Sequence, residues 1–504
     1  MVAVSARQLL GAVGIAVALL MPATAAGNTI VPDTRADESG HDPDNGNCTL
    51  REAIESADRD ISEDACRRGN GADVIKLGRG TYQLSVPGVE PIGSTEIDNR
   101  VGDLDVGLWD GGPLRIVGHR RGSTLDGNDH DRVLQVFDTR LTLERLTITD
   151  GDAVNGGGGV SFATGAVGRL LRTKIAGNVA ADAGGGVGIF PGAKATFTRG
   201  SVNRNITEGG GGGVHVFGEA VFEGTKLIRN EAGFGGGIAV LPEAIARLRR
   251  ATLDRNQATV FAGGINVQTD ALLQASRTTI SRNTTAGVGG GIRVDRGTVR
   301  LVASTLAGNR TDEAGGGLSM GSDPSFPASV RIVNSTISGN VADADGDGGA
   351  GEGGGLSLAS FGSKVVISST ITRNRATRGG GILGPFVTGL GPVELKGTIV
   401  AGNTATLANP VNGPDCLFLT AESGESLGHN LIGDPNGCDG MDARPSDIFG
   451  NPGLGPLRRN GGPTQTHALR QSSRAIDKGP PDAPRRDQRG VRRDDPDIGS
   501  FERA

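Results

Sequence analysis

The chain has 504 residues and a formal net charge of −5, too mild at this length to attract nucleic acid to the protein as a whole. Its 86 glycines far exceed ordinary usage, but they follow no strict Gly-X-Y register, which excludes collagen. The glycine runs alternate with β-branched and leucine-rich segments that can be buried, which excludes a mostly disordered chain.

Residues 1–26 have the features of a secretory signal peptide. Arg7 precedes an apolar run from Leu9 to Met21, and small residues follow with the spacing of a cleavage site, either Ala23 with Ala25 or Thr24 with Ala26. The alternative is a retained N-terminal membrane helix. No later stretch is apolar enough to cross a bilayer as a helix. We therefore expect the mature chain to be secreted or held at the cell surface, with no transmembrane segment after signal cleavage.

Residues 27–71 are predicted to form an N-terminal cap. Thr49 and Glu52 have the spacing of a capping box, which marks the start of a short helix. Apolar side chains follow the helical period along one face of this segment: Leu50, Ala53, Ile54 and Ala57. A short amphipathic helix at this position would cover the apolar edge of a repeat domain that follows it.

Four cysteines form two local pairs, Cys48 with Cys66 and Cys416 with Cys438, one at each end of the repeat region. In an exported chain this arrangement predicts two disulfides, and free thiols are the alternative. Each bond would close a loop of roughly twenty residues, which stabilises a fold by about 3 kcal/mol in the chain-entropy model.

An asparagine followed a few residues later by a run of glycines recurs at intervals of 25 to 34 residues. A period of this size predicts stacked copies of one supersecondary unit. Asp150 fits one step before the first asparagine. The nine asparagines are Asn178, Asn205, Asn230, Asn256, Asn283, Asn309, Asn340, Asn374 and Asn403.

Each repeat contains at least two short strand patterns separated by turns. Residues 72–410 are therefore predicted to form an all-β, single-stranded parallel β-helix of the pectin-lyase type, right-handed because right-handed crossovers dominate parallel sheets. Some twelve rungs at about 4.8 Å each would give a rod on the order of 60 Å long. The asparagines are expected to tolerate left-handed turns and to hydrogen-bond into a ladder, so we assign them a structural role.

The period lengthens between Asn309 and Asn374, which predicts loops that protrude from the rod. Residues 411–504 are rich in proline, glycine and aspartate and are predicted to form a loop-rich C-terminal cap. Because insertions in repeat proteins often carry binding, these two irregular regions are the predicted places for a ligand.

The phrase CTLREAI at residues 48–54 resembles the signature of the CSLREA family of exported bacterial proteins, with Thr49 in place of the usual serine. Residues 451–479 and 487–502 resemble the choice-of-anchor Q domain, although this chain reads SRAID where that domain usually has SPAID. The GGG-I and I-x-x-N phrases are also similar to repeats of chlamydial polymorphic outer-membrane proteins. The resemblance implies a secreted or surface β-helix without an established reaction, and it supplies no catalytic residues.

The segment with Asp343, Asp345 and Asp347 begins like a calcium loop, with carboxylates at alternate positions and a glycine at the turn. The closing glutamate of such a loop belongs at its twelfth position, whereas Glu352 lies at the tenth. Calcium is therefore one prediction, and a solvated acidic insertion is the other. No other cofactor is predicted.

Our leading hypothesis is a non-catalytic adhesion protein or matrix scaffold, whose partner is an extracellular polysaccharide or a cell-surface protein and not a nucleic acid. The alternative is a carbohydrate-active enzyme, a lyase or hydrolase acting on an acidic polysaccharide, because many β-helices cleave polysaccharides. Hydrolases need paired carboxylates on one face, and no such constellation is visible in the sequence. Aromatic residues make up 3% of the chain, which leaves few rings for stacking on sugars.

Overall fold

The computed structural model describes residues 26–38, 45–88, 99, 101–321, 325, 327–349, 351–407 and 412–503. The predicted signal peptide lies outside these residues, except for Ala26. Among the described residues no helix is both long and apolar enough to cross a membrane.

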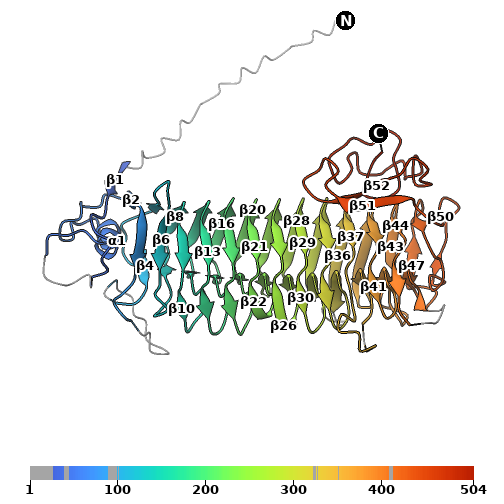
Figure 1. Ribbon diagram of the computed structural model, residues 1–504, viewed down its shortest axis with the longest axis horizontal. Coiled ribbons are helices and arrows are strands. Elements are labelled where there is room, and N and C mark those ends of the chain that lie inside the picture. The colour runs from blue at the N-terminus through green and yellow to red at the C-terminus, as the bar shows by residue number, and fades with distance from the viewer. Residues whose placement is uncertain are drawn as a thin grey trace, which may run out of the picture.

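The chain forms a parallel β-helix, as predicted (Figure 1). The helix has three long sheets and a shorter fourth one. Sheet A has 15 strands from β1 (Ala26–Ile30) to β49 (Met441–Asp442), and sheet C has 12 from β4 (Leu104–Val106) to β46 (Cys416–Leu417). Sheet D has seven, from β10 (Asp152–Ala153) to β34 (Arg310–Thr311), and β41 (Arg375–Ala376) pairs with β45 (Thr404–Ala405).

Sheet B has 14 strands. In chain order they are β3 (Gly80–Gln83), β6 (Ser123–Asp126), β9 (Thr147–Thr149), β13 (Lys174–Ala176), β17 (Ser201–Asn203), β21 (Lys226–Ile228), β25 (Thr252–Asp254), β29 (Thr279–Ser281), β33 (Thr305–Ala307), β37 (Thr336–Ser338), β40 (Thr370–Thr372), β44 (Ile399–Val400), β48 (Leu431–Ile432) and β50 (Ile448–Phe449).

A typical turn of the coil visits the sheets in the order C, A, B, D. One such turn consists of β15 (Val187–Ile189), β16 (Lys194–Thr198), β17 and β18 (Ile206–Thr207). In the left and middle part of Figure 1, up to β30, the chain runs downward across the near face, from sheet A through sheet B to sheet D, while it advances from left to right. This sense of rotation makes the coil right-handed.

The core is a set of columns in which equivalent side chains of successive turns lie above one another. Val160, Val187 and Val214 are in register in sheet C and are fully buried. In sheet A the rings of Phe197 and Phe222 stack with their centroids 4.7 Å apart. Each fully buried apolar side chain of this size contributes about 1.5–3 kcal/mol, so the stacking of turns stabilises the rod.

The nine asparagines form a continuous buried ladder. The side-chain amide of each asparagine from Asn178 to Asn374 donates to the amide oxygen of the next one at 2.8–3.0 Å. Asn403 ends the series by donating to Asp415 Oδ1 at 2.9 Å. At the other end the Gly151 N–H donates to Asn178, so Gly151 occupies the position before Asn178 and Asp150 lies one residue outside the ladder.

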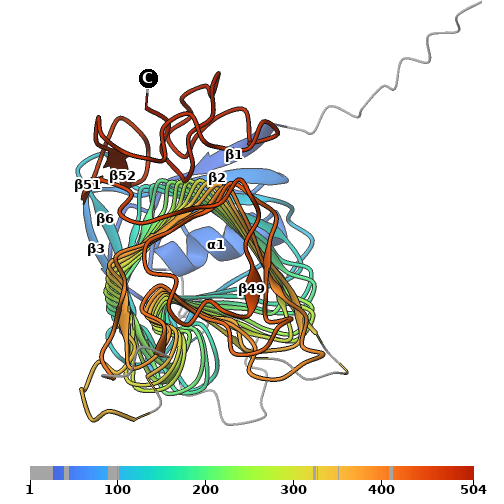
Figure 2. The ribbon, with the colours of Figure 1, turned by 90° about the vertical axis from the view of Figure 1, so that its right-hand side faces the viewer.

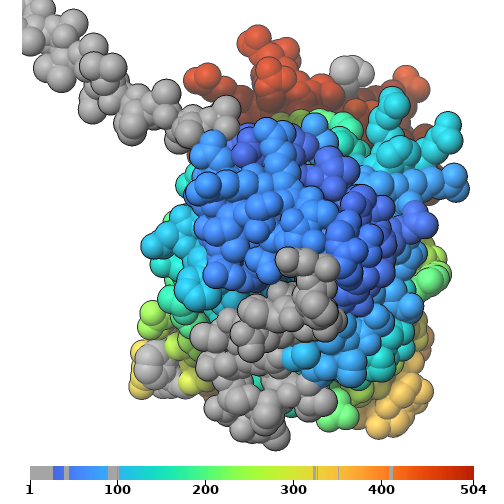
Figure 3. Space-filling model, turned by 90° about the vertical axis from the view of Figure 1, so that its left-hand side faces the viewer, coloured from blue at the N-terminus to red at the C-terminus, as the bar shows by residue number. Residues whose placement is uncertain are grey.

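The N-terminal segment closes one end of the rod. Helix α1 (Leu50–Arg59) begins with the predicted capping box between Thr49 and Glu52. Arg51 is fully buried, with its guanidinium 2.7 Å from Asp37 and 2.8 Å from the carbonyl of Asp103. Figure 2 shows α1 at the far end of the rod's interior, and Figure 3 shows the outer surface of this cap.

Both predicted disulfides are present, Cys48–Cys66 in the N-terminal cap and Cys416–Cys438 near the last turns. The coil extends past residue 410, because β46, β48, β49 and β50 continue sheets A, B and C. Residues 450–503 then leave the coil and form the segment that we name the tail. The antiparallel strands β51 (Leu454–Arg458) and β52 (Thr466–Leu469) belong to it.

The tail packs against the side of the rod (Figure 1). His467 lies 2.9 Å from Ser338 Oγ on β37, and Ser500 Oγ lies 3.1 Å from Thr370 Oγ1 on β40. A second apolar cluster joins the two parts, with Ile399 and Leu431 from sheet B against Ile498 from the tail. The tail therefore covers the outer face of sheet B over the later turns of the rod.

Candidate functional site

Sheet B is bordered by two sharp corners, and at each of them one residue per turn adopts a left-handed conformation. The A–B corner residue lies six positions before the ladder residue, and the B–D corner residue lies one position before it. Neighbouring corners are joined by backbone hydrogen bonds such as Arg172 N–H to Thr198 O at 2.9 Å. Equivalent corner residues therefore recur at the strand spacing of about 4.8 Å.

Arginine occupies most of these corners over the first half of the rod, with φ values of 51–56°. The A–B corner carries Arg145, Arg172, Arg199, Arg250 and Arg277, and the B–D corner carries Arg204, Arg229, Arg255 and Arg282. We name the outer face of sheet B from β9 to β29, together with these two columns, the arginine face. With about 3.3 Å per extended residue, the two columns lie on the order of 15 Å apart.

Most of this charge is not neutralised. Arg145 pairs with Glu144, and Arg255 and Arg282 pair with Asp254. The other six corner arginines are exposed and have no ion pair within the described part of the chain. Lys174 and Lys226 add two exposed cations from the strands between the columns.

The pKa of Glu144 reports the positive field at this corner. A hydrogen bond from Arg115 is the largest cause that lowers this pKa, and the charges of Arg145 and Arg172 act in the same direction. A second carboxylate brought to the face would meet the same cations. The face is thus suited to an anion.

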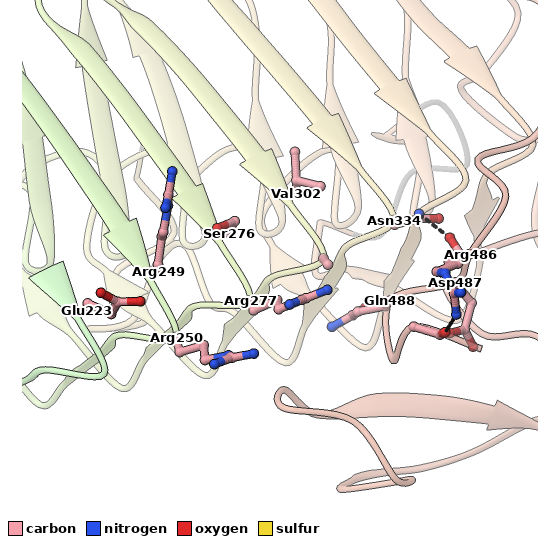
Figure 4. A pocket seen from close by; sticks show the side chains of 12 residues that line it. Glu223, Arg249, Arg250, Ser276, Arg277, Val302, Asn334, Arg486, Asp487 and Gln488 are labelled. Carbon is pink, nitrogen blue, oxygen red and sulfur yellow. Dashed lines mark hydrogen bonds between the residues drawn. The ribbon is translucent and has the colours of Figure 1, made fainter. Parts of the chain in front are cut away.

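A pocket of about 500 Å³ lies where the arginine face meets the tail (Figure 4). Arg249, Arg250 and Arg277 line it from the rod, and Arg486 lines it from the tail. Asn334 fixes the two parts together, because its amide donates to the carbonyl of Arg486 at 2.7 Å. The junction therefore has a defined shape with arginine on both sides.

The corners change character beneath the tail. At the A–B corner the sequence of arginines gives way to Ala303, Asn334, Ser368 and Gly397, and at the B–D corner Gly308 and Gly339 replace arginine. The outward residues of β33, β37 and β40 are small as well, including Thr305, Ala307, Thr336, Ser338 and Thr370, and these five are buried.

The predicted calcium-ligand residues do lie together, far from the arginine face on the loop after β37. One carboxylate oxygen from each of Asp343, Asp345 and Asp347 lies within 4.8 Å of the others, and only Asp343 is buried. Asp343 Oδ1 accepts from the Gly348 N–H at 3.1 Å. Glu352 pairs with Arg378 instead of joining this cluster. Three carboxylates supply half of the six to eight oxygens that calcium takes, so backbone or water oxygens would complete the site.

The carboxyl groups with raised pKa values lie away from the arginine face. Burial raises the pKa of Asp58 to about 7 beneath the N-terminal cap, and burial raises that of Glu502 to about 7 inside the tail. Burial, and then the nearby Asp345, raises the pKa of Asp312 beside sheet D. Each of these groups is explained by packing in its own region.

Sequence reasoning found the asparagines but not the arginines beside them. The signal is present, since arginine or glycine stands one residue before each ladder asparagine and an arginine often stands six before it. This arginine pattern indicates a shared surface only once the structure shows that both positions border sheet B.

No protein-family model matches the chain, and a comparison with curated proteins gives no match. The resemblance to the CSLREA family therefore stays a prediction. Among solved structures, a mannuronic-acid-specific family 6 polysaccharide lyase from human gut microbiota is similar, at 12% identity and a TM-score of 0.37 over 75% of this chain and 86% of that one. A pectate lyase is similar at 14% identity and a TM-score of 0.37 over 95% of this chain and 97% of that one. At these values neither likeness assigns an activity to this chain.

Proposed function

We propose that the protein is an exported, non-catalytic β-helix that binds an extended acidic polysaccharide along the arginine face. The observation that carries this proposal is the pair of arginine columns in register along the open part of sheet B. A polymer with one carboxylate per sugar unit meets a cation at nearly every rung, and many weak contacts then add up. The two disulfides support an oxidising, extracellular compartment.

Backbone conformation is an independent argument for a functional role of these arginines. A non-glycine residue in the left-handed region costs on the order of 1 kcal/mol, and glycine adopts it freely. The chain uses glycine at some of the same corners, such as Gly177 and Gly224. Arginine at the other corners is thus disfavoured by the backbone, which supports selection for its side chain.

The composition of the face favours a polysaccharide over a single-stranded nucleic acid. Proteins that hold single strands stack the bases on aromatic rings. The outward residues of β13, β17, β21, β25 and β29 include no aromatic side chain: Lys174, Ala176, Ser201, Asn203, Lys226, Ile228, Thr252, Asp254, Thr279 and Ser281. Cations, hydroxyls and amides suit the carboxylates and hydroxyls of an acidic sugar chain.

The test is binding of purified protein to polygalacturonate, alginate and neutral dextran at several salt concentrations. We expect binding to the two acidic polymers, weakening as salt rises, and none to dextran. A variant with Arg172→Gln, Arg199→Gln and Arg250→Gln should lose at least about tenfold in affinity, because each lost charged contact is worth roughly 1 kcal/mol or more. The matched control carries Arg375→Gln, Arg459→Gln and Arg470→Gln, three exposed arginines outside the face.

Two results would contradict the proposal. Equal binding by the two triple variants would remove the arginine face as the site, and progressive shortening of the polymer would show that the protein is a polysaccharide-cleaving enzyme. Tighter binding to single-stranded DNA than to either acidic polysaccharide would reassign the partner.

Calcium at the Asp343, Asp345 and Asp347 cluster stays a separate prediction, supported by the grouping of the three carboxylates. Calcium that binds only the folded chain raises the melting temperature. Thermal unfolding with calcium and with chelator would check this, using Asp345→Asn with Asp347→Asn as the variant. An identical melting curve in calcium and in chelator would remove the prediction.

A further inference from the structure

The arginine face has one blocked end. Arg277 is the last arginine of the A–B corner, and the next two positions there are Ala303 and Asn334. Thr464 of the tail donates to the carbonyl of Ala303 at 3.1 Å, and Asn334 donates to the tail carbonyl of Arg486. A polymer that follows the arginine column therefore meets the tail directly after Arg277.

The pocket at this junction is strongly cationic. Arg249, Arg250 and Arg277 enter it from the rod and Arg486 from the tail, and Figure 4 shows Arg277 extending toward the tail. Of its two carboxylates, Asp487 is buried and already bound by Arg489 Nε at 2.8 Å and the Val491 N–H at 2.9 Å. Glu223 is the other carboxylate and is exposed. Four arginines and one carboxylate without such contacts thus line the pocket, and in Figure 4 the Arg249 side chain points away from the tail.

The walls on the tail side are rigid. The Gln488 amide is buried and donates to Thr305 Oγ1 and Thr464 Oγ1, each at 2.9 Å. Arg486 Nη1 donates to the carbonyl of Gly490 at 2.8 Å, which fixes its guanidinium at the rim. A volume of about 500 Å³ falls within the usual range for small-ligand sites. The pocket can therefore hold a compact anionic group in a fixed place.

We propose that this pocket binds the terminal acidic unit of the polysaccharide chain, so that the tail acts as an end stop for the arginine face. This inference rests on the proposed function. An internal segment must continue in both directions, and the tail blocks one of them. A chain end needs only one exit, which the arginine column provides.

The experiment compares polygalacturonate with an equal mass of galacturonate hexamers made from it, and measures how much protein each binds at saturation. Recognition of chain ends predicts that bound protein rises with the number of ends. Arg486→Gln should weaken hexamer binding about tenfold, the effect of one lost charge-assisted contact, and leave the melting temperature unchanged. Arg492→Gln is the matched control, since Arg492 is an exposed tail residue that pairs only with exposed Asp494. Arg486→Met is the second variant if Arg486→Gln does not fold, because it removes the same tail charge and leaves the arginine face intact.

The outcomes separate this inference from the function on which it rests. In one outcome the polymer binds, the triple variant of the corner arginines loses binding, and the amount of bound protein depends on the mass of polysaccharide. If Arg486→Gln then also binds hexamer as tightly as the unmodified protein does, the end stop is wrong and the proposed function stands. If neither polymer nor hexamer binds, both are wrong. The end stop is supported if the amount of bound protein rises with the number of chain ends, and if Arg486→Gln binds hexamer weakly while Arg492→Gln does not.

Discussion

The two halves of sheet B share one backbone and carry opposite side chains. In the open half, from β9 to β29, arginine stands at most corners, and the outward strand residues are mostly half-buried, with Lys174 and Lys226 exposed. In the covered half, from β33 to β44, the corners are mostly small and the tail buries the outward face. The asparagine ladder runs unchanged through both halves. The rod is thus a uniform scaffold, and its corners decide which half meets the tail and which meets solvent.

This difference indicates that a binding site can lie on the regular turns of the rod. Most corners beneath the tail are small, because another chain segment lies on them; Arg373 is the exception and donates to the tail carbonyl of Gly455 at 3.4 Å. At an open corner nothing requires a large side chain, and the left-handed backbone favours glycine. Repeated arginine there is best explained by a ligand outside the chain.

The largest expected effect comes from placing an arginine in the covered half. Ser338→Arg would bury a charge against His467 and should lower the free energy of unfolding by about 4 kcal/mol. Ser281 occupies the equivalent position in the open half, because Ser281 pairs with Ala307 and Ala307 pairs with Ser338. Ser281→Arg should change the free energy of unfolding by less than about 0.5 kcal/mol. Denaturant unfolding checks both variants. Equal effects would break the distinction between the halves.

The ladder should respond alike in the two halves. Asn256→Ala and Asn340→Ala each remove a buried amide that donates at 2.9 Å to the next ladder oxygen and at 3.1 Å to a strand carbonyl. Both should cost about 3 kcal/mol, because buried partners are left unsatisfied. Asn203→Ala, outside the ladder, serves as the control. A large difference between Asn256→Ala and Asn340→Ala would show that the scaffold is not uniform.

The covered half should depend on pH. His467 Nδ1 donates to Gly455 O at 2.7 Å and its Nε2 accepts from Ser338, so the ring is neutral, and burial lowers its pKa to about 4. Between about pH 6.5 and pH 4, the unfolded chain therefore carries a proton on this imidazole that the folded chain does not bind. This contribution is complete above pH 6.5 and is lost as pH falls from 6.5 through 4, by about 3 kcal/mol.

Glu502 acts in the opposite direction. Burial raises its pKa to about 7, so its contribution is present below its unfolded value and is lost as pH rises through 7. The protection of tail amides against hydrogen exchange, relative to their intrinsic exchange at each pH, should therefore be highest between about pH 5 and 6.5. The acid limb should disappear in His467→Gln, while exchange in the open half stays unchanged. Exchange in the tail and in the open half that changes in parallel would contradict this account.

The smallest effect concerns the corners themselves. Arg199→Gly relieves a left-handed arginine at φ 56° and should raise the free energy of unfolding by up to about 1 kcal/mol while weakening polymer binding. Arg169→Gly, at an exposed position within β12 (Val167–Leu171), should lower it by about 0.5–1 kcal/mol. Thermal unfolding checks the pair. Destabilisation by Arg199→Gly would weaken the argument that function selects these arginines.

Local signals in the sequence predicted the scaffold. The asparagine period, the capping box at Thr49 and the paired cysteines each act over one repeat or less, and the structure contains a β-helix, α1 and two disulfides accordingly. The C-terminal region was predicted to be rich in loops, but the position of the tail depends on contacts between residues far apart in sequence, such as Ser338 with His467 (129 apart) and Ser304 with Gln488 (184 apart). Nothing local encodes those pairs.

The candidate site was harder to predict for the same reason. Arg199 and Arg204 are separated by a strand, and only the folded coil brings them to the two borders of one face. We expected binding where the period breaks, whereas the proposed site lies on its most regular turns. The acidic insertion at Asp343 was visible because its three carboxylates are close in sequence.

The most direct test of the central claim is arginine footprinting. Phenylglyoxal would modify the protein alone and with bound polygalacturonate, and mass spectrometry would read each arginine. Our account predicts protection of Arg172, Arg199 and Arg250 with no change at Arg375 and Arg470. Protection at Arg375 and Arg470 while the corner arginines stay reactive would contradict it.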